Sequence, residues 1–265
     1  MPDRRRLVSE MTRTKTSEMT TAVMVFAKEP APGRVKTRLS PAVSPEDACA
    51  LYEAFLQDVL EMVERFGDEH RGVQPWLAWS GSLEASAVRG AVDQGFRVHP
   101  QGDGDLGDRM KRGVAAVREA GGDRVIILGT DSPTLSKEHL STALLLLRDR
   151  QVVFGPSFDG GYYLLGLDLG GDERPEEVIF EGISWSTPAV MEESWARAQE
   201  AGLLCELLGF WYDVDTVEDL KTLRFHLVDY LAERDPQIAR HTGQLLASRP
   251  SLLSPLEPSH PQEDP

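Results

Sequence analysis

Four cationic side chains lie within eleven residues of a chain that is acidic as a whole. They are Lys28, Arg34, Lys36 and Arg38. The full chain has 43 acidic and 28 basic residues and a formal net charge of -15. The cluster follows an apolar, strand-like run at residues 22–27, and a glycine and two prolines make it typical of a loop. In open α/β sheets, such a loop at the carboxyl end of a strand binds phosphorylated ligands. We therefore expect it to bind a strongly anionic small molecule.

Carboxylates that could hold a metal ion follow two later apolar runs. Asp131 follows the run at residues 125–128, and Asp213 and Asp215 follow the run at residues 203–208. Magnesium is typically held by one or two carboxylates together with substrate phosphates. We therefore predict that Asp131 and Asp215, helped by Asp213, hold Mg²⁺ or Mn²⁺. The alternative is that Asp131 caps a turn and that the other two cap the last helix.

A third group of residues is predicted to bind the acceptor substrate. Its members are Asp159, Gly160, Gly161, Tyr162 and Trp185. The first four would place a carboxylate, closely approaching backbone and an aromatic ring beside the acceptor. A simple turn is the alternative for them, and a place in the hydrophobic core is the alternative for Trp185. Asp103 and Asp105 could also bind acceptor hydroxyls, although we interpret their loop as a solvated turn.

The cationic loop lacks the two common nucleotide-binding motifs. A P-loop needs glycine directly before its lysine and again five residues earlier, where this chain has Val35 and Pro30. The Rossmann pattern GxGxxG is absent from the end of the first predicted strand. Residues 102–107 match that pattern formally, but their two aspartates would repel a pyrophosphate. A loop of cations combined with carboxylates at later strand ends suits metal-bridged nucleotide chemistry instead.

These side chains must be positioned by alternating strands and helices. Strands are expected at residues 22–27, 76–79, 96–99, 125–128, 152–154 and 162–167. Helices are expected at residues 45–66, 83–92, 137–148 and 216–230. A further helix is expected over Met110, Val114 and Val117, and another opens at residues 183–188 and runs to 201. This order predicts an α/β fold with a mixed, mostly parallel sheet. The simplest division is a disordered tail at residues 1–20, one nucleotide-binding transferase domain at residues 21–232, and a short helix with a disordered tail at residues 233–265.

The overall composition excludes several classes of protein. The excess of acidic residues opposes binding along a nucleic-acid backbone, so no nucleic acid partner is expected. The longest apolar cluster, residues 144–147, is far too short to span a membrane, and the first 19 residues do not resemble a signal peptide. Cys49 and Cys205 have neither CxxC spacing nor nearby histidines. We expect a cytoplasmic protein with reduced thiols, in which Met19 is an alternative start.

Six motifs, in order along residues 23–220, carry a resemblance to a known family. They are Phe26-Ala27-Lys28-Glu29-Pro30, Lys36-Thr37-Arg38-Leu39, Gly129-Thr130-Asp131-Ser132-Pro133, Gly155-Pro156 with Asp159-Gly160-Gly161-Tyr162, Trp185-Ser186-Thr187, and Asp213-Val214-Asp215 with Asp219-Leu220. Together they resemble the radical-SAM/selenodomain-associated "transferase 1" family. That resemblance implies a single three-layer α/β/α Rossmann-like domain of the glycosyltransferase-A (GT-A), nucleotide-diphospho-sugar transferase fold.

Two better understood groups of enzymes share parts of these motifs. The segment from Lys36 to Leu39 is similar to the first loop of 2-phospholactate guanylyltransferases, and the segment from Asp213 to Leu220 resembles the end of CMP-Kdo synthetases. This similarity implies that the loop cations hold a nucleoside triphosphate and that Asp131 and Asp215 hold magnesium. The nucleotide-binding residues expected on this basis are Ala27, Lys28, Gly33, Arg34, Lys36, Thr37, Arg38 and Thr130.

The reaction expected from these residues is nucleotidyl transfer. An acceptor oxygen of a small anionic molecule would attack the α-phosphorus of a nucleoside triphosphate, and pyrophosphate would leave, with Lys36, Arg38 and Asp131 as the catalytic residues. A glycosyltransferase that uses a nucleotide sugar is the alternative. GT-A glycosyltransferases usually carry Asp-x-Asp at a strand end, whereas residues 129–132 contain one aspartate. A nucleotide-binding protein without catalytic activity is the third possibility. The base, the acceptor and the oligomeric state stay open.

Overall fold

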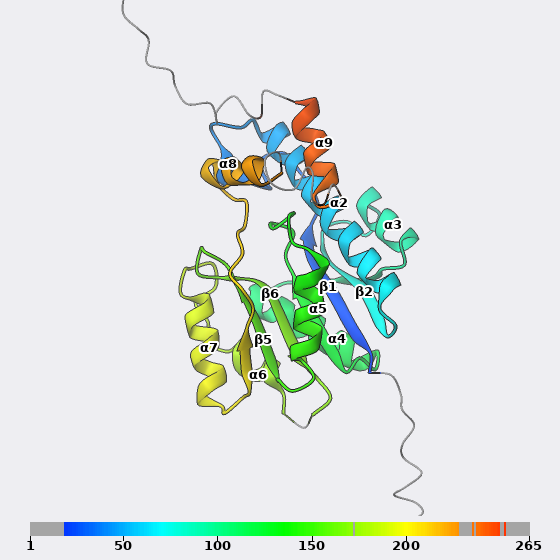
Figure 1. Cartoon of the computed structure of the whole chain (residues 1–265), viewed down its shortest axis with the longest axis vertical. Coiled ribbons are helices and arrows are strands. Elements are labelled where there is room, and N and C mark those ends of the chain that lie inside the picture. Colours follow the sequence, from blue (N-terminus) through cyan, green and yellow to red (C-terminus); the bar gives the residue numbers. More distant parts are fainter. Residues whose placement is uncertain (1–18, 172, 228–234, 236, 250–251, 253–265) are drawn as a thin grey trace, which may run out of the picture.

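The computed structural model describes residues 19–171, 173–227, 235, 237–249 and 252 (Figure 1). Its strands form one seven-stranded sheet in the order β3-β2-β1-β4-β6-β5-β7. The strands are β1 (Thr21–Lys28), β2 (Val73–Ser80), β3 (Arg97–Pro100), β4 (Arg124–Leu128), β5 (Val152–Pro156), β6 (Tyr162–Asp168) and β7 (Cys205–Leu207). Neighbouring strands are parallel except where β6 pairs with β4 and β5. The predicted α/β fold with a mixed, mostly parallel sheet is therefore confirmed.

Helices cover both faces of the sheet and make a three-layer molecule. One face carries α2 (Pro45–Glu69), α3 (Ser86–Asp93) and α5 (Lys137–Leu146), and the other carries α4 (Leu106–Glu119), α6 (Pro175–Ile179) and α7 (Val190–Glu200). Val23 and Val25 of β1 lie in the first buried cluster, whereas Ala22 and Met24 lie in the second. Because successive side chains of a strand point to opposite faces, β1 must be apolar on both.

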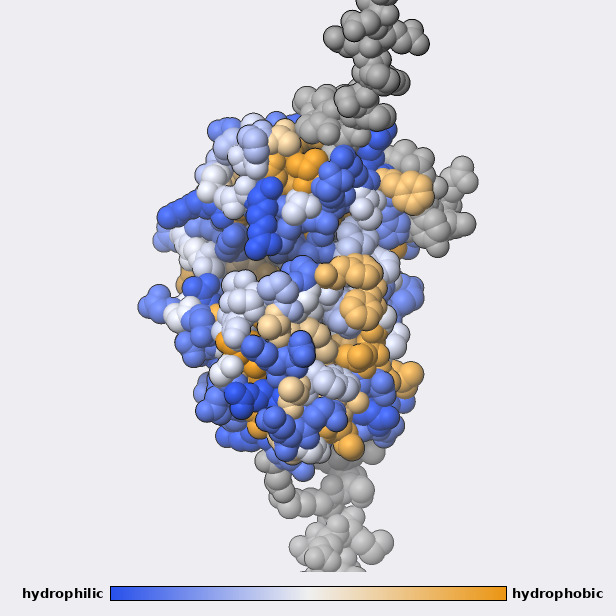
Figure 2. Space-filling view, turned by 90° about the vertical axis from the view of Figure 1, so that its left-hand side faces the viewer, coloured by the Kyte–Doolittle hydropathy of each residue, from blue (hydrophilic) through white to orange (hydrophobic). Residues whose placement is uncertain are grey.

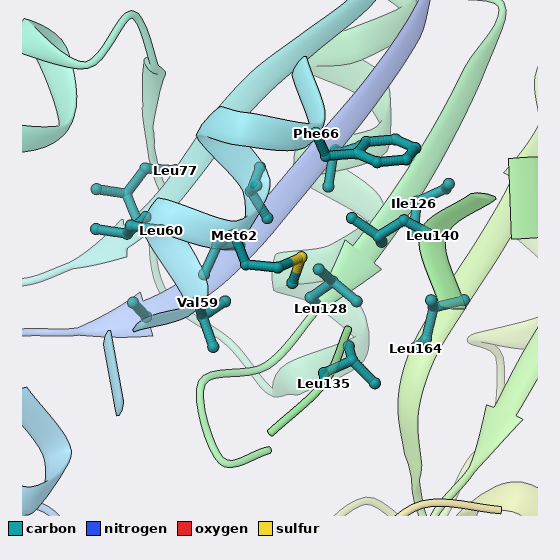
Figure 3. Close-up of a cluster of buried hydrophobic side chains, with 14 of the residues drawn as sticks. Val59, Leu60, Met62, Phe66, Leu77, Ile126, Leu128, Leu135, Leu140 and Leu164 are labelled. Carbon is teal, nitrogen blue, oxygen red and sulfur yellow. The ribbon is translucent and has the colours of Figure 1, made fainter. Parts of the chain in front are cut away.

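The larger buried cluster joins α2 to the centre of the sheet (Figure 3). Val59, Met62 and Phe66 of α2 lie within this cluster, together with Ile126 and Leu128 of β4. The helix begins after Ser44, whose hydroxyl accepts the Asp47 N–H at 3.1 Å and caps its first turn. This packing fixes the position of α2 relative to the carboxyl ends of β1 and β4, where the cationic loop and Asp131 follow.

A third cluster lies beyond the end of the sheet at which β1 finishes (Figure 1). It contains Leu39 of the 3₁₀ helix η1 (Thr37–Leu39), Leu51 of α2, Leu220 of α8 (Val217–Phe225) and Leu246 of α9 (Arg240–Ser248). The described part of residues 233–265 is therefore packed against α2 in the same hydrophobic cluster. Of the tail expected at residues 1–20, residues 1–18 lie outside the described residues, as do residues 253–265 of the segment expected at residues 233–265.

Some elements differ from the expected ones at their ends. The helix expected to open at residues 183–188 begins only at Val190, because Ser186 adopts a left-handed conformation with φ 64° that a helix cannot contain. α5 ends at Leu146 rather than 148, and α2 extends to Glu69. The short helix α6 falls in a stretch for which the sequence predicted only a loop. These differences leave the order of the strands and main helices unchanged.

The surface is mainly hydrophilic, with apolar side chains gathered on the face viewed in Figure 2. The large exposed apolar residues of the chain include Leu204 and Leu207, at the edge strand β7, and Phe158 and Phe210, whose rings stack at 5.5 Å. Phe158 and Phe210 belong to the loops that follow β5 and β7. No helix among the described residues has the length and apolar character needed to cross a membrane.

Candidate active site

The cationic loop leaves β1 and brings only one of its four cations into the interior. Lys36 is buried, whereas Lys28, Arg34 and Arg38 are exposed. The backbone of Lys36 is left-handed, with φ 49° and ψ 37°, and this conformation starts η1 directly afterwards. A non-glycine residue in this region is strained, and such strain is common at functional sites. The fold therefore separates Lys36 from the other loop cations.

The Lys36 ammonium contacts three oxygens from distant parts of the chain. Its Nζ lies 2.5 Å from Asp131 Oδ1, 3.0 Å from Asp215 Oδ1 and 2.7 Å from the Val214 carbonyl oxygen. The Phe55 ring of α2 lies on another side, with its centroid 5.4 Å from Nζ. Burial alone would lower the pKa of Lys36, but the Asp131 and Asp215 carboxylates outweigh it and raise the pKa. The side chain is therefore a charged ammonium at neutral pH.

The two segments that carry the carboxylates are joined along their length. The Val214 N–H donates to the Asp131 carbonyl at 2.8 Å, and the Ser132 hydroxyl donates to Asp213 Oδ1 at 2.5 Å. Further along, the Thr134 hydroxyl donates to the Tyr212 hydroxyl at 3.0 Å. The loop after β4 and the segment after β7 thus approach each other although β6 and β5 lie between these strands in the sheet.

Asp213 lies in the most strongly perturbed carboxylate environment of this site. Burial raises its pKa from 3.8 to about 6, and the charges of Asp131, Asp159 and Asp215 act in the same direction. The hydrogen bond from Ser132 opposes them. Four aspartates therefore lie within electrostatic range of one another, and such a concentration of like charge is typical of functional sites.

The helix α8, expected from the sequence as the last one of the domain, is capped by neither Asp213 nor Asp215. Thr216 is the N-cap of α8 and forms a capping box with Asp219, whose carboxylate also accepts the Asp215 N–H at 3.1 Å. The Asp215 side chain instead faces Lys36 and, through Oδ2, lies 3.5 Å from Nη1 of Arg38. The alternative interpretation of these two aspartates as helix caps is therefore wrong.

The donor set suits a magnesium ion, although a dedicated cage is absent. Asp131 and Asp215 converge on one point, and their side chains are 43% and 31% exposed, so solvent can reach both. Among the described residues, no group of three or more His, Cys, Asp or Glu is arranged to hold a metal ion. Two hard oxygen ligands that leave room for substrate phosphates match the way in which magnesium is usually bound. The predicted metal role of these aspartates stays a prediction.

The predicted acceptor residues do not all lie together. Asp159 accepts the Ser157 hydroxyl at 2.5 Å and the Gly161 N–H at 3.0 Å, and its charge reaches Asp213. The Tyr162 hydroxyl is buried, and its ring packs on Phe154 at 5.9 Å. Asp159 thus lies on the side of the carboxylates, whereas Tyr162 packs against the sheet's second buried cluster.

Trp185 lies against the start of α4. A Cβ atom added to Gly107 would be 2.7 Å from the Trp185 indole, so the glycine permits this close packing. Asp105 caps the same helix by accepting the Asp108 N–H at 2.9 Å, and Arg109 and Arg112 donate to carbonyls of the preceding loop. The interpretation of residues 102–107 as a turn agrees with these contacts.

The remaining predicted nucleotide-binding residues lie around the end of β1. Ala27 is buried in the strand, Gly33 and Thr37 are exposed in the loop, and Thr130 is buried beside the Tyr52 hydroxyl. Because Gly33, Thr37 and three of the loop cations are exposed, solvent can reach the carboxyl edge of β1.

Several residues that hold this edge were not predicted. The Tyr52 hydroxyl accepts the Lys28 N–H at 2.9 Å, and Gln101 donates to the carbonyls of Ala27 and Ala78, each at 2.9 Å. Ser132 belongs to a motif quoted above, but no sequence pattern indicated its contact with Asp213. Tyr52 and Gln101 are single polar groups in apolar surroundings, a pattern that only the fold makes informative.

The chain is similar to several known proteins. A family model described as "Uncharacterized protein conserved in bacteria (DUF2064)" matches residues 67–187. The phosphoenolpyruvate guanylyltransferase of Conexibacter woesei is 30% identical over 230 residues, which cover 81% of this chain and 92% of the relative. The 2-phospho-L-lactate guanylyltransferase of Methanothermobacter thermautotrophicus is 28% identical over 195 residues, which cover 72% of this chain and 79% of the relative.

Solved structures show the same fold. A protein from Desulfovibrio desulfuricans G20, provisionally described as a nucleotide-diphospho-sugar transferase, has a TM-score of 0.75 at 30% identity and covers 89% of this chain and 97% of its own. The 4-diphosphocytidyl-2C-methyl-D-erythritol synthase of Anaerococcus prevotii has a TM-score of 0.52 at 11% identity, with 79% of this chain and 96% of its own covered. The expected GT-A-like, nucleotide-diphospho-sugar transferase fold is therefore confirmed.

Proposed function

This chain belongs to the DUF2064 family and is a transferase, and we propose that it moves a nucleoside monophosphate from a nucleoside triphosphate to a small anionic acceptor. The relatives named as guanylyltransferases support GTP as the nucleotide. Their names also support a phosphorylated carboxylic acid, such as phosphoenolpyruvate or 2-phospholactate, as the acceptor. The radical-SAM association in the name of the resembled family stays a prediction.

The observation that carries this proposal is the ion cluster at the end of β1, in which Lys36 is buried and its two carboxylate partners are partly exposed. Lys36, Asp131 and Asp215 meet within 3.0 Å, and Asp213 lies close enough for these carboxylates to raise its pKa. Removing the Lys36 ammonium from water is unfavourable for folding, so a purely structural role at this position would be served better by an apolar side chain. The cluster lies at the carboxyl edge of parallel strands, where α/β sheets bind their ligands.

The proposed reaction forms one bond and breaks one. An oxygen of the acceptor's phosphate attacks the α-phosphorus, and the bond from that phosphorus to the bridging oxygen of the β-phosphate breaks, releasing pyrophosphate. The acceptor phosphate is already ionised at neutral pH, so this step needs no general base. Arg34 and Arg38, whose side chains are exposed, would bind the triphosphate and stabilise the charge that develops on its oxygens.

The other predicted site residues would bind the metal ion and the acceptor. Asp131 and Asp215, helped by Asp213, would hold a magnesium ion. When bound, the ion supplies charge neutralisation for the phosphoryl oxygens and the leaving group. Asp159 lies on the side of these carboxylates and would orient the acceptor through its loop. Trp185, which lies against α4, would cover the bound acceptor.

Transfer of a sugar from a nucleotide sugar is the second candidate. The description of the Desulfovibrio desulfuricans relative as a nucleotide-diphospho-sugar transferase favours it. Sugar transfer would bind the diphosphate through the same residues but would release a nucleoside diphosphate instead of pyrophosphate. The identity of the leaving group therefore separates the two reactions.

A single assay tests both candidates. We would incubate the full chain with Mg²⁺, each of the four nucleoside triphosphates or a panel of nucleotide sugars, and phosphoenolpyruvate, 2-phospholactate or other small phosphorylated acids. Products would be identified by mass spectrometry and pyrophosphate would be measured enzymatically. We expect pyrophosphate and a new nucleotide-linked acid from GTP. Release of a nucleoside diphosphate would support sugar transfer instead.

Variants connect the activity to the site. Asp131→Asn should reduce kcat at least a hundredfold, because it removes the negative charge that faces both Lys36 and the bound metal. Arg38→Ala should mainly raise the KM for the nucleotide. Asp68→Asn, at an exposed position of α2, is the matched control and should leave both constants unchanged. Full activity of Asp131→Asn would show that the reaction occurs elsewhere.

A further inference from the structure

The Lys36 ammonium has no hydrogen-bond capacity left for a substrate. A lysine ammonium has three N–H donors, and Asp131, Asp215 and the Val214 carbonyl are three acceptors within 3.0 Å of Nζ. Its side chain is 2% exposed, and the Phe55 ring lies against it. Lys36 can contact a nucleotide phosphate only if it first releases at least one of these oxygens.

The ammonium lies between the two carboxylates predicted to hold the metal. Oδ1 of Asp131 and Oδ1 of Asp215 both point to Nζ, at 2.5 and 3.0 Å. A divalent cation bound by the same two side chains would experience the repulsion of a unit charge a few ångströms away. Two cations that need the same carboxylates cannot both interact with them optimally.

We propose that the Lys36 ammonium and the divalent cation compete for the Asp131 and Asp215 carboxylates, so that Lys36 serves as their resident counter-ion until a nucleotide arrives. This proposal rests on the proposed function, because it takes the metal and the nucleotide from it. Lys36 is then a positioning residue in the free protein, because it neutralises the repulsion between the two carboxylates and holds their side chains close together.

Competition of this kind couples the two ligands. A phosphate that attracts the Lys36 ammonium frees the carboxylates for the metal, and a metal on the carboxylates frees the ammonium for a phosphate. Because coupling between two sites is reciprocal, each ligand must strengthen binding of the other. The loop position of Lys36, in a strained left-handed conformation between β1 and η1, suits a residue that changes partners.

Manganese binding to the nucleotide-free protein tests this competition without any turnover. Mn²⁺ would be titrated against the wild type, Lys36→Met and Lys36→Arg, with free Mn²⁺ measured by electron paramagnetic resonance. Lys36→Met removes the charge and keeps the chain length, and it should bind Mn²⁺ about tenfold more tightly or better. Lys36→Arg keeps the charge and should bind like the wild type. Unchanged or weaker binding by Lys36→Met would overturn the proposal.

Two further measurements control this result. Arg38→Met removes a neighbouring cation that is 67% exposed, so solvent screening should limit its effect on Mn²⁺ affinity to about threefold. Thermal unfolding should show Lys36→Met destabilised without metal and restored by Mn²⁺, whereas the wild type gains less. An equal gain in both proteins would contradict the counter-ion role.

A measurement on the wild type covers the case in which Lys36→Met does not fold. Acetylation of lysines, followed by peptide mass spectrometry, reports how accessible each amine is. Lys36 should react slowly in the free protein and faster as Mn²⁺ displaces it, while the exposed Lys28 serves as the internal reference. Constant labelling of Lys36 at saturating Mn²⁺ would overturn the proposal. If Mn²⁺ binding follows these expectations but no nucleotide is turned over, the proposed function fails and the competition stands.

Discussion

Asp213 shows at the scale of a single residue how the site differs from the rest of the protein. Among the described residues its carboxylate accepts a hydrogen bond from Ser132 alone, and burial together with three other aspartates raises its pKa. Lys36 neutralises Asp131 and Asp215 directly but does not contact Asp213. The site therefore retains a carboxylate that is unfavourable for the free protein, as expected where a cationic ligand completes the charge balance.

Asp213→Asn should stabilise the protein at alkaline pH. The pKa of Asp213 is 3.8 unfolded and about 6 folded. Below 3.8 both states are protonated, and no stability is lost. As the pH rises towards and past 6, the unfolded state loses its proton first, so the folded state is penalised by about 2 kcal/mol once the partial exposure of the group is considered. Asparagine removes this penalty and keeps an acceptor for Ser132.

Urea unfolding in the presence of a chelator measures this effect. The gain of Asp213→Asn should be larger at pH 8 than at pH 5, and Asp93→Asn, at an exposed position of α3, should show no such dependence. Transferase activity should fall in Asp213→Asn despite the added stability. An equal gain at both pH values would mean that the carboxylate does not titrate as the structure indicates.

The loop between β5 and β6 shows how an element places its residues. Gly160 has φ 89°, and its carbonyl accepts the Met191 N–H at 2.9 Å. A Cβ atom on Gly160 would lie 2.1 Å from the Pro188 carbonyl oxygen. The loop can therefore approach the start of α7 only with glycine at this position, and that approach fixes Asp159, directly before it.

Gly160→Ala should be strongly destabilising. The added methyl group meets a backbone oxygen that cannot move aside, and alanine also disfavours positive φ, which together should cost about 3 kcal/mol. Gly33→Ala is the matched control: it has φ 74° but nothing within 4 Å of its Cβ, and should cost only about 1 kcal/mol. Chemical denaturation of both variants separates the steric effect from the conformational one. Similar losses would exclude a steric role of Pro188.

On the scale of the whole molecule, α9 ties the chain's later part to α2. The N-cap of α9, Ala239, has no side-chain oxygen, and Asp58 of α2 replaces it across the interface. Its carboxylate accepts the N–H groups of His241 and Thr242 at 2.7 and 2.9 Å and the Thr242 hydroxyl at 2.5 Å. Burial raises the pKa of Asp58 despite these hydrogen bonds. A cap supplied by another helix links two elements that are distant in sequence.

Asp58→Ala should detach α9 from α2. Loss of three hydrogen bonds to a buried carboxylate should lower the free energy of unfolding by about 2–3 kcal/mol. Hydrogen exchange should accelerate in α9 before it does in β1 or β4. Asp68→Ala on the exposed side of the same helix should change stability by less than about 0.5 kcal/mol. Unaltered exchange in α9 would show that its apolar contacts alone hold it.

The sequence by itself determined the fold class and indicated a candidate chemistry for the site. Apolar periodicity located six of the seven strands apart from their exact ends, because the faces that a strand or helix buries are encoded locally. The exception is β7, which lies in an apolar run at residues 203–208 for which no strand was expected. The positions of Lys36, Asp131 and Asp215 in segments that follow apolar runs indicated a phosphate and metal site, since strand ends meet at one edge of a sheet. The motifs also indicated the GT-A-like fold that the solved structures confirm.

Only the tertiary structure decided which residues meet. The order of the strands brings Asp215 beside Asp131 and places the ammonium of Lys36, alone of the four loop cations, between them. It turns the Tyr162 hydroxyl inward and packs α9 against α2. Contacts of this kind depend on how elements far apart in the chain are stacked, and local sequence patterns do not encode that order. For the same reason, only the folded molecule distinguishes the exposed loop cations from Lys36, whose ammonium is already paired with two carboxylates.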